Sequence, residues 1–534
     1  MKKALHFLSS RLFAISFIIL LQFFWSALLL MKIGSHAGEV RFVLWCLSVI
    51  ISIWLLNKWD NPAYKLAWII PILMFPTFGG MLYLIFGNKE PTRRLRKKLE
   101  YGYALSKPLL IQKKEVRDKL YQKDIRIGRQ SEYLIKYANC PVYENTISKY
   151  LESGEAYYTT LVEELKRAKK FIFLEFFIIE KGMMWNTILD ILLMKIREGV
   201  EVRVIYDDVG CVTKLPYRYE KHLTELGIKC VSFNQFIPIF SLALNHRDHR
   251  KIVVIDGHTA FSGGINLADE YINEVKRFGH WKDTGIMIKG EAVWNFTVMF
   301  LQMWNSIIRT DSHFSFYQYH YALDWFQKQN RVWNENVYAT EEKKDEKKSF
   351  WENDGFVQPY GDSPLDQEIV GENVYLNLIN QAKNYVYITT PYLIIDNEMM
   401  TALCLAAKRG VDIRIMTPGI PDKKLTFLLT ESYYRQLIGA GVKIYEYTPG
   451  FLHAKMMIAD DEVGTVGTIN LDYRSLYLHF ECGVFLYATK TILDIKEDML
   501  RIMKASHQVE EEECQKNWFQ SLLQCILRVF APLM

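Results

Sequence analysis

The sequence has no C-x-x-C pair, the spacing common to zinc sites and thiol redox sites. Its eight cysteines are scattered along the 534 residues: Cys46, Cys140, Cys211, Cys230, Cys404, Cys482, Cys514 and Cys525. A structural zinc site or a dithiol redox site is therefore not expected. Dispersed cysteines suit a reducing compartment, which favours the cytoplasm.

Clusters of aspartate, glutamate and histidine with metal-ligand spacing are also missing, so we expect no metal and no other cofactor. The net charge is only +5, although the basic residues are unevenly placed. Hydrophobic residues make up 50% of the chain and aromatic residues 14%. These fractions are high for a soluble enzyme and indicate contact with a membrane. The length allows about three domains.

Charge is absent from three stretches near the N-terminus. Residues 12–31 contain 20 residues without a charged side chain, enough for a helix to span a bilayer. Residues 42–57 form a second uncharged run, and residues 66–88 form a third, which contains two prolines and a Gly-Gly pair. We predict about three transmembrane helices in residues 1–90, the third one kinked. For the second and third runs, a buried helical hairpin of a soluble domain is the alternative.

The densest basic cluster follows the third run, in NKEPTRRLRKKLEYG. Its members are Lys89, Arg93, Arg94, Arg96, Lys97 and Lys98. The positive-inside rule keeps this cluster in the cytoplasm, where it can also attract anionic lipid head groups. Lys2, Lys3 and Arg11 favour the opposite orientation for three spans, but the larger cluster has the greater weight. A solvated helix face is the alternative interpretation of the cluster.

The strongest signal is a duplicated H-x-K-x4-D motif. Its two copies, 204 residues apart, are His249, Lys251 and Asp256, and His453, Lys455 and Asp460. A G-x-x-N run follows each copy at the same distance and adds Gly264, Asn266, Thr468 and Asn470 as candidate phosphate-binding or supporting residues. In a single copy, the histidine would be interpreted as an ordinary polar residue at a strand start. Two matching copies strongly disfavour that interpretation.

Two histidines brought together can share a displacement at phosphorus, because neutral imidazole is a nucleophile and protonated imidazole is an acid. Paired lysines supply positive charge and paired asparagines supply neutral donors for phosphate oxygens, without a metal. Each histidine also needs a carboxylate that fixes its tautomer. Asp283 in WKDT and Glu481 in HFECG lie at suitable distances along the chain for this role.

These motifs resemble those of the phospholipase D superfamily, in which two copies meet in one active site. The resemblance implies a phosphohistidine intermediate and, for most lipid enzymes of the superfamily, a reaction without metal. KLAWIIPILMFPTFGGMLYLIFGNKE is similar to the membrane anchor of bacterial cardiolipin synthases, and IPDKK and YEYTPGFLHAK are further likenesses. The resemblance covers nearly the whole chain from about Pro62. The family usually has asparagine where this chain has His479, and it often has two spans, which makes residues 12–31 an extra one.

The order of expected elements repeats in the two halves of the chain. Strands are expected at 169–179, 200–206, 227–233, 384–390 and 441–447, and helices at 188–197 and 401–408. This repeat predicts an α/β fold of two duplicated phospholipase D-like α/β/α units related by a pseudo-two-fold axis. Asp207 and Asp208 follow one strand, and we interpret them as solvated turn acids rather than site residues.

The expected division of the chain has six parts. These are a membrane anchor (1–90), a basic juxtamembrane linker (91–144), the first unit (145–310), a charged linker (311–350), the second unit (351–510) and a C-terminal amphipathic helix (511–534). The tail places Trp518, Leu522, Ile526, Val529 and Phe530 on one helical face. That pattern fits an interfacial helix, or a helix that closes over the core.

The resemblance implies a cardiolipin synthase of the bacterial cell membrane, multi-pass, with a cytoplasmic catalytic part. Such an enzyme joins two phosphatidylglycerol molecules and releases glycerol, with His249 interpreted as the nucleophile and His453 as the acid and base. Phosphatidylglycerol and anionic membrane lipid are the expected partners. Nucleic acid is not, because three spans argue against a soluble nuclease. The alternatives are a phospholipase D-type hydrolase, a phosphatidyltransferase with another acceptor such as phosphatidylethanolamine, and a non-catalytic membrane scaffold, which the intact motifs disfavour.

Overall fold

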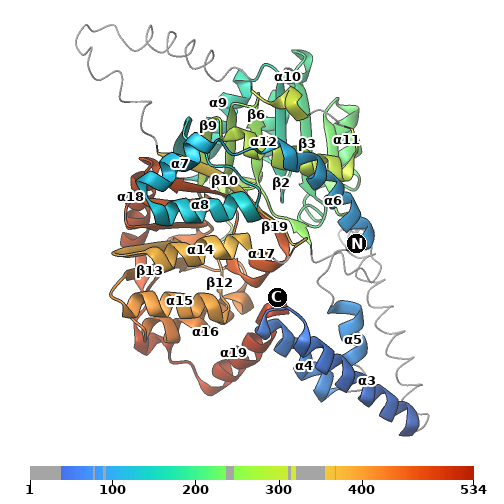
Figure 1. Ribbon diagram of the computed structural model, residues 1–534, viewed down its shortest axis with the longest axis vertical. Coiled ribbons are helices and arrows are strands. Elements are labelled where there is room, and N and C mark those ends of the chain that lie inside the picture. Colours follow the sequence, from blue (N-terminus) through green and yellow to red (C-terminus); the bar gives the residue numbers. More distant parts are fainter. Residues whose placement is uncertain are drawn as a thin grey trace, which may run out of the picture.

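Two α/β units form most of the protein (Figure 1). The computed structural model describes residues 38–75, 79–87, 92–235, 246–310, 314–319, 355–366 and 368–533. The first unit lies above the second in Figure 1, and a group of N-terminal helices lies to one side near the C-terminus. The expected α/β fold with duplicated units is confirmed.

The first unit is built on a seven-stranded mixed sheet in the order β1-β9-β7-β6-β2-β3-β4. Its strands are β1 (Thr146–Leu151), β2 (Phe171–Phe176), β3 (Glu201–Asp207), β4 (Lys229–Phe233), β6 (Ile252–Ile255), β7 (Thr259–Gly263) and β9 (Gly285–Gly290). Its helices are α9 (Gly154–Arg167), α10 (Met183–Arg197), α11 (Tyr219–Glu225) and α12 (Val293–Ile307). The expected strand at 169–179 is therefore present but shorter.

Strand β2 is buried on both faces, which explains its continuous apolar run. Phe171 and Phe173 pack in the core shared with α12, where Phe173 stacks on Phe300 with ring centroids 4.5 Å apart. Ile172 and Leu174 point the other way, into the core beneath α9 and α10. Side chains alternate along a strand, so a strand covered on both sides needs apolar residues at every position.

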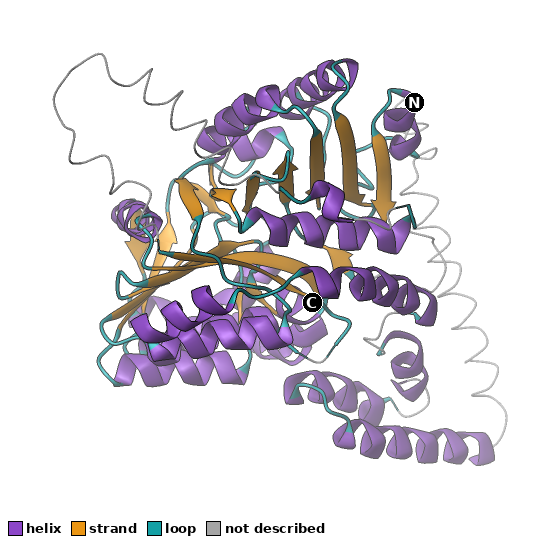
Figure 2. Cartoon of the chain, turned by 45° about the horizontal axis from the view of Figure 1, so that its top comes forward, coloured by secondary structure: helices purple, strands orange, loops and turns teal. Residues whose placement is uncertain are grey.

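The second unit repeats this plan, with its strands in the order β10-β19-β17-β16-β11-β13-β14-β20. These are β10 (Phe356–Asp362), β11 (Tyr385–Thr389), β13 (Asp412–Pro418), β14 (Lys443–Tyr447), β16 (Met456–Ala459), β17 (Val463–Gly467), β19 (His479–Tyr487) and β20 (Ser506–Gln508). The helices are α14 (Val370–Gln381), α15 (Asn397–Lys408), α16 (Lys424–Ile438), the short α17 (Tyr473–Tyr477) and α18 (Thr491–Lys504). Layers of helices cover the sheets in Figure 2.

Two short parallel ladders join one unit to the other. β5 (Arg247–Asp248) pairs with the start of β19, and β8 (His280–Lys282) pairs with β15 (Gly450–Leu452). Each ladder therefore pairs a segment from the first unit with one from the second. The apolar core is also continuous between the units, since buried residues of both sheets belong to one cluster.

Residues 91–144 were expected to form a linker, and the structure corrects that prediction. They contain α6 (Arg93–Ser106), α7 (Lys114–Lys123) and α8 (Ile125–Tyr137). α6 packs closely on α12, because a Cβ at Gly102 would meet the Gln302 carbonyl oxygen at 2.4 Å. Leu99, Val116 and Leu120 join the main core. The apolar positions between the basic residues, rather than the charge, decide the structure of this segment.

The N-terminal helices differ from the predicted spans. The run 42–57 lies in α3 (Gly38–Asn57), but the run 66–88 is not one kinked helix. It is divided between α4 (Pro62–Met74) and α5 (Gly79–Phe86). Gly79 approaches α4 so closely that a Cβ would meet the Ile72 Cα at 2.4 Å. Among the described residues, we find no helix with the length and apolarity needed to cross a membrane. Residues 12–31 lie outside the described part.

The C-terminal helix α19 (Trp518–Phe530) keeps its apolar face exposed and has no buried residue. It contacts α16 through polar groups, including a bond from Gln524 Nε2 to the Leu428 carbonyl. The following turn η6 (Ala531–Leu533) contacts α4. The expected linker 311–350 falls largely outside the described residues, but η4 (Phe314–Tyr317) within it buries Phe314 and Tyr317.

Candidate active site

A cavity of about 670 Å³ lies between the two units and is lined by residues from both. It contains both motif histidines, His249 and His453, and both motif asparagines, Asn266 and Asn470. Cationic side chains also line it: Lys214, Arg247, Arg277, Lys423 and Arg474. The volume lies in the range of small-molecule sites, and the excess of positive charge suits an anionic ligand.

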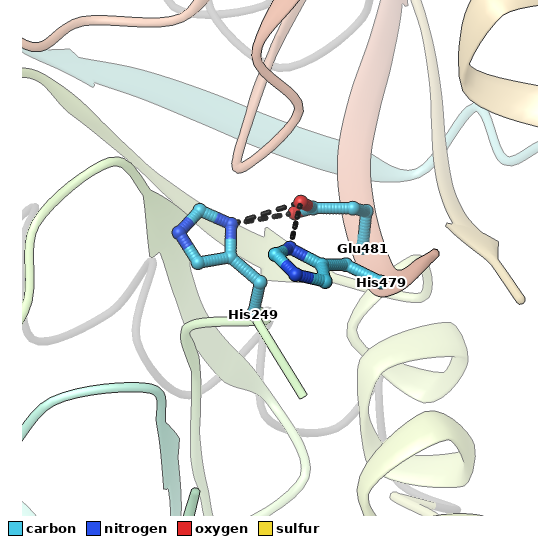
Figure 3. Close-up of side chains that lie close together, drawn as sticks. All are labelled: His249, His479 and Glu481. Atoms are coloured by element: carbon cyan, nitrogen blue, oxygen red, sulfur yellow. Dashed lines mark hydrogen bonds and ion pairs between the residues drawn. The ribbon is translucent and has the colours of Figure 1, made fainter. Parts of the chain in front are cut away.

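His249 is held by a carboxylate from the other unit. Its ring faces Glu481 in Figure 3, and its Nδ1 lies 2.9 Å from Glu481 Oε1 and 3.0 Å from Oε2. Glu481 also accepts hydrogen bonds from the hydroxyls of Thr468 and Ser475, so its orientation is fixed from three sides. With the proton on Nδ1, the Nε2 lone pair of His249 is left for chemistry.

His453 has the matching arrangement with the roles of the units exchanged. Its Nδ1 lies 2.6 Å from Asp283 Oδ2. Asp283 can approach because residue 264 is glycine, where a Cβ would meet Asp283 Oδ1 at 2.1 Å. Asp283 Oδ1 in turn accepts the backbone N–H of Thr284 at 2.8 Å. Gly264 therefore makes room for the carboxylate rather than touching phosphate itself.

The two ladders between the units explain this crossed pairing. The His249 N–H donates to the Phe480 carbonyl at 3.0 Å, one residue before Glu481. The His453 N–H donates to the Lys282 carbonyl at 2.7 Å, one residue before Asp283. Each histidine is thus bonded through its backbone beside the carboxylate that orients its ring.

The motif lysines are buried and lie next to the histidines. Lys251 Nζ donates to the His249 carbonyl at 2.6 Å, and Lys455 Nζ donates to the His453 carbonyl. Burial lowers the pKa of Lys251 to about 8 and that of Lys455 to about 7, although Glu481 and Asp283 oppose the shift. Each ammonium group has three N–H donors, so a phosphate oxygen would be a favourable acceptor in addition to the backbone carbonyl.

Burial also lowers the histidine pKa values. The pKa of His453 falls to about 4, first through burial and then through the charge of Lys455. The pKa of His249 falls well below its usual value for the same reasons, first through burial and then through the charge of Lys251. Both rings are therefore neutral near pH 7 before an anionic substrate arrives. A nucleophile needs this neutral form.

The asparagines and aromatic residues form the walls. Asn266 accepts from the Ile178 N–H at 3.0 Å and donates to the Tyr271 hydroxyl at 2.7 Å. The Oδ1 atom of Asn470 is buried and has no hydrogen-bond partner among the described residues. Tyr271 and Trp281 each lie with their ring centroids 5.5 Å from that of His453. These side chains restrict water around the histidines.

Asp256 and Asp460 were expected to be catalytic, and the structure corrects this. Asp256 accepts the backbone N–H groups of Lys169, Lys170 and Phe171 at 2.7–2.9 Å. Asp460 does the same at the start of β11, at 2.7–2.9 Å. Strand β6 separates Asp256 from Lys251, and five residues of strand span about 16 Å. Both aspartates therefore cap a neighbouring strand at the end of the sheet away from the histidines.

Asp207 also differs from its expected role, because it is fully buried rather than solvated. It accepts the N–H groups of Val209, Gly210 and Asp248 at 2.9–3.1 Å, and burial raises its pKa to about 6. It holds β5, and so the residue before His249, in place. Asp208 is buried as well.

Comparison with known proteins agrees with this geometry. A family profile described as "Cardiolipin synthase, PLD-like domain" matches residues 161–304 and 375–503, and one described as "Phospholipase_D-nuclease N-terminal" matches residues 42–88. A Streptococcus mutans protein is 44% identical over 90% of this chain and 99% of its own length. A cardiolipin synthase of Alkalihalophilus pseudofirmus is 32% identical over 92% of this chain and 93% of its own length. The chain belongs to the cardiolipin synthase family.

A solved structure confirms the fold relationship of this family member. The phosphatidylserine synthase of Haemophilus influenzae superposes with a TM-score of 0.54 at 17% identity, covering 76% of this chain and 98% of that one. A second relative by sequence, "Cardiolipin synthase 2" of Bacillus anthracis, is 33% identical over 89% of this chain and 87% of its own length. The expected family is therefore confirmed.

Sequence reasoning assigned no site role to Ser475, Phe177 or His479, which all contribute to this cardiolipin synthase-like site. Ser475 supports Glu481, and Phe177 lies edge-on to His249 with centroids 5.0 Å apart. His479 lies with its centroid 5.6 Å from that of His249, and its Nδ1 is 3.8 Å from Glu481 Oε1. Within the described part of the chain, His249, His479 and Glu481 form a group that could hold a metal ion. The unusual residue at position 479 was the one available signal.

Replacement of Asp256 by alanine should lower stability rather than remove a reacting group. Three backbone donors would lose their acceptor, at a cost of about 1–3 kcal/mol. Thermal and denaturant unfolding should show a lower free energy of unfolding for Asp256→Ala. The control Asp190→Ala, at an exposed position on α10, should leave the free energy of unfolding unchanged. Turnover per folded molecule should persist at low temperature. Unchanged unfolding with abolished turnover would instead place Asp256 in the chemistry.

The activity should depend on pH through the lysines. A lysine with a lowered pKa is charged below that pKa and neutral above it, so kcat/KM should fall as pH rises through about 7 to 8. Lys455→Arg keeps its charge and should move this alkaline limb upward. Lys496→Arg, at the exposed pair with Asp461, should leave the profile in place. If kcat/KM of Lys455→Arg falls at the same pH as that of the wild type, the alkaline fall belongs to another group.

Proposed function

We propose that this protein is a cardiolipin synthase that transfers a phosphatidyl group from one phosphatidylglycerol to another and releases glycerol. The observation that carries the proposal is the pair of neutral histidines, each oriented by a carboxylate of the opposite unit, in one cationic cavity. The relatives that bear the name cardiolipin synthase support the same activity.

In the first step, His249 Nε2 attacks the phosphorus of the first phosphatidylglycerol. The bond from phosphorus to the glycerol head-group oxygen breaks, and that oxygen takes a proton from His453. The negative phosphate raises the pKa of His453 above its value in the empty site, so the ring can carry this proton. Lys251 and Lys455 stabilise the charge that develops on the non-bridging oxygens, while Asn266 and Asn470 offer neutral contacts.

In the second step, His453 is neutral and accepts the proton of the terminal hydroxyl of a second phosphatidylglycerol. That oxygen attacks the phosphatidyl group on His249, and the bond from nitrogen to phosphorus breaks. Cardiolipin forms and both histidines return to their starting state. Glu481 stabilises the phosphorylated ring of His249, and Asp283 stabilises protonated His453. Every charge in the cycle has a partner in this chain, so the proposed steps use no metal.

We also propose that the protein is held at the bacterial cell membrane with its catalytic units on the cytoplasmic side. Large apolar side chains are exposed along α3, α4 and α19, where Trp518 is 77% exposed, and in the turn between α3 and α4, where Trp59 is 89% exposed. Patches of this kind on soluble monomers mark interaction surfaces. Ala531, at the end of α19, lines the active cavity, so this apolar surface adjoins the site. The basic residues of α6 would face anionic lipid.

The transfer can be tested with purified protein and phosphatidylglycerol labelled in its phosphate and in its head group. Cardiolipin and free glycerol should form in equal amounts, with or without EDTA. His249→Ala and His453→Ala should each lower turnover by about 10⁴-fold or more. His222→Ala, an exposed change on α11, should not.

A phosphatidyl donor with a good leaving group distinguishes the roles of the two histidines. Such a leaving group departs without being protonated. His453→Ala should therefore accumulate an acid-labile phosphatidyl adduct on His249, whereas His249→Ala should form none. An adduct on His453 would exchange the two roles. Phosphatidic acid in place of cardiolipin would show that the protein is a hydrolase, and activity that needs added Mg²⁺ would overturn the metal-free mechanism.

The membrane surface can be tested with Trp518→Glu combined with Phe519→Glu. Each apolar side chain gains about 1.5–3 kcal/mol on leaving water, so turnover of phosphatidylglycerol in vesicles should fall by about tenfold or more. Turnover of detergent-dispersed lipid should remain. Leu493→Glu, which is also exposed but lies on α18, is the matched control. Equal losses on vesicles and on detergent would show that α19 supports the fold instead.

A further inference from the structure

The group around Glu481 contains a histidine that the proposed reaction does not use. His479 is 9% exposed, and its Nε2 is buried with no hydrogen-bond partner among the described residues. An unpaired buried nitrogen of this kind costs about 1–3 kcal/mol. It stands at the wall of the active cavity, only two residues before the carboxylate that orients His249.

The other imidazole nitrogen of His479 faces the same carboxylate as His249. Figure 3 shows both rings turning Nδ1 toward Glu481. The two Nδ1 atoms lie 2.9 Å and 3.8 Å from Glu481 Oε1. In a tetrahedral zinc site with bonds of about 2.0–2.1 Å, neighbouring ligand atoms are about 3.3 Å apart. The three ligand atoms lie within 4.8 Å of one another, so shifts of the side chains would bring them to this spacing.

We infer that His249, His479 and Glu481 bind a zinc ion that reversibly inhibits the enzyme. Two imidazoles and a carboxylate are an ordinary donor set for Zn²⁺, with water as the fourth ligand. All three groups are buried, so the ion would sit inside the site rather than on its surface. The nearby ammonium groups of Lys251 and Lys455 weaken the hold on a dication, which suits a reversible inhibitor.

The inhibition follows from the tautomer of His249. In the working site the proton is on Nδ1, beside Glu481, and the Nε2 lone pair attacks phosphorus. Zinc on Nδ1 moves the proton of the neutral ring to Nε2, where it blocks the lone pair. Glu481 is engaged with the metal at the same time and no longer stabilises a charged ring. The inference rests on the proposed role of His249 only for this consequence, not for the binding itself.

Binding can be measured without any turnover, by titrating full-length protein in detergent with Zn²⁺ against a chromophoric chelator and with Co²⁺ for its visible spectrum. The wild type should bind one ion with a four-coordinate Co²⁺ spectrum. His479→Asn and His249→Ala should each weaken this binding by about tenfold or more. His453→Ala should retain it, because that ring pairs with Asp283. His507→Asn, at an exposed pair with Glu513, controls for a surface site and should also retain it.

The activity assay gives the second readout. Zn²⁺ should inhibit wild-type transfer, EDTA should restore it, and the residual activity of His479→Asn should resist Zn²⁺. Equal binding in the wild type, His479→Asn and His249→Ala would overturn the inference, as would the absence of a bound ion in the wild type. Failure to form cardiolipin would instead contradict the proposed function, and it would leave the binding results unaffected.

Discussion

The site depends on a crossed pairing, in which each histidine takes its carboxylate from the other half of the chain. His249 and Glu481 are 232 positions apart, and His453 and Asp283 are 170 apart. Neither unit alone contains an oriented histidine. The two short ladders, β5 with β19 and β8 with β15, fix this arrangement through the backbone. A duplicated fold therefore has one active site, because each copy completes the other.

Burial of so many charged groups is what makes these groups reactive. In the dry interior the histidines lose their proton more easily than in water, and the lysines hold theirs less firmly. The carboxylates oppose both shifts. An arriving phosphodiester supplies the missing negative charge, so the site is electrically complete only with substrate bound. Burial of these charged groups costs free energy of folding, and the continuous apolar core that joins the two units offsets this cost.

The sequence predicted that His249 and His453 lie in one site, because the duplication of the motif is visible along the chain. It also predicted strands β2 and β11, since every residue of both strands is buried and most are apolar. It could not predict the crossed pairing, because spacing along one half suggests a carboxylate from that same half. The motif aspartates were misjudged for a related reason. A regular motif looks like one chemical unit, although strand β6 puts Asp256 at the far end of the sheet from Lys251.

The run 66–88 was also misjudged, because composition does not show where one helix ends and the next begins. Gly79 lets α5 return against α4, and Gly102 brings α6 onto α12. Each close approach depends on a glycine at one position. Hydropathy is averaged over many residues, so it does not detect such a position. The basic residues on α6 likewise led to the expectation of a linker, although apolar positions between them pack in the core.

The apolar helices and the catalytic carboxylate meet at α17. Asn61, which caps α4, donates to the Tyr477 hydroxyl at 2.9 Å and to Asp396 at 3.1 Å. The Tyr477 hydroxyl also donates to Glu372 at 2.9 Å, and burial together with the charge of Asp396 raises the pKa of Glu372 to about 9. Two residues earlier, Ser475 on the same short helix supports Glu481. The apolar helix α4 and the carboxylate that orients His249 are thus anchored to one five-residue element, which couples the position of this apolar helix to the geometry of the site.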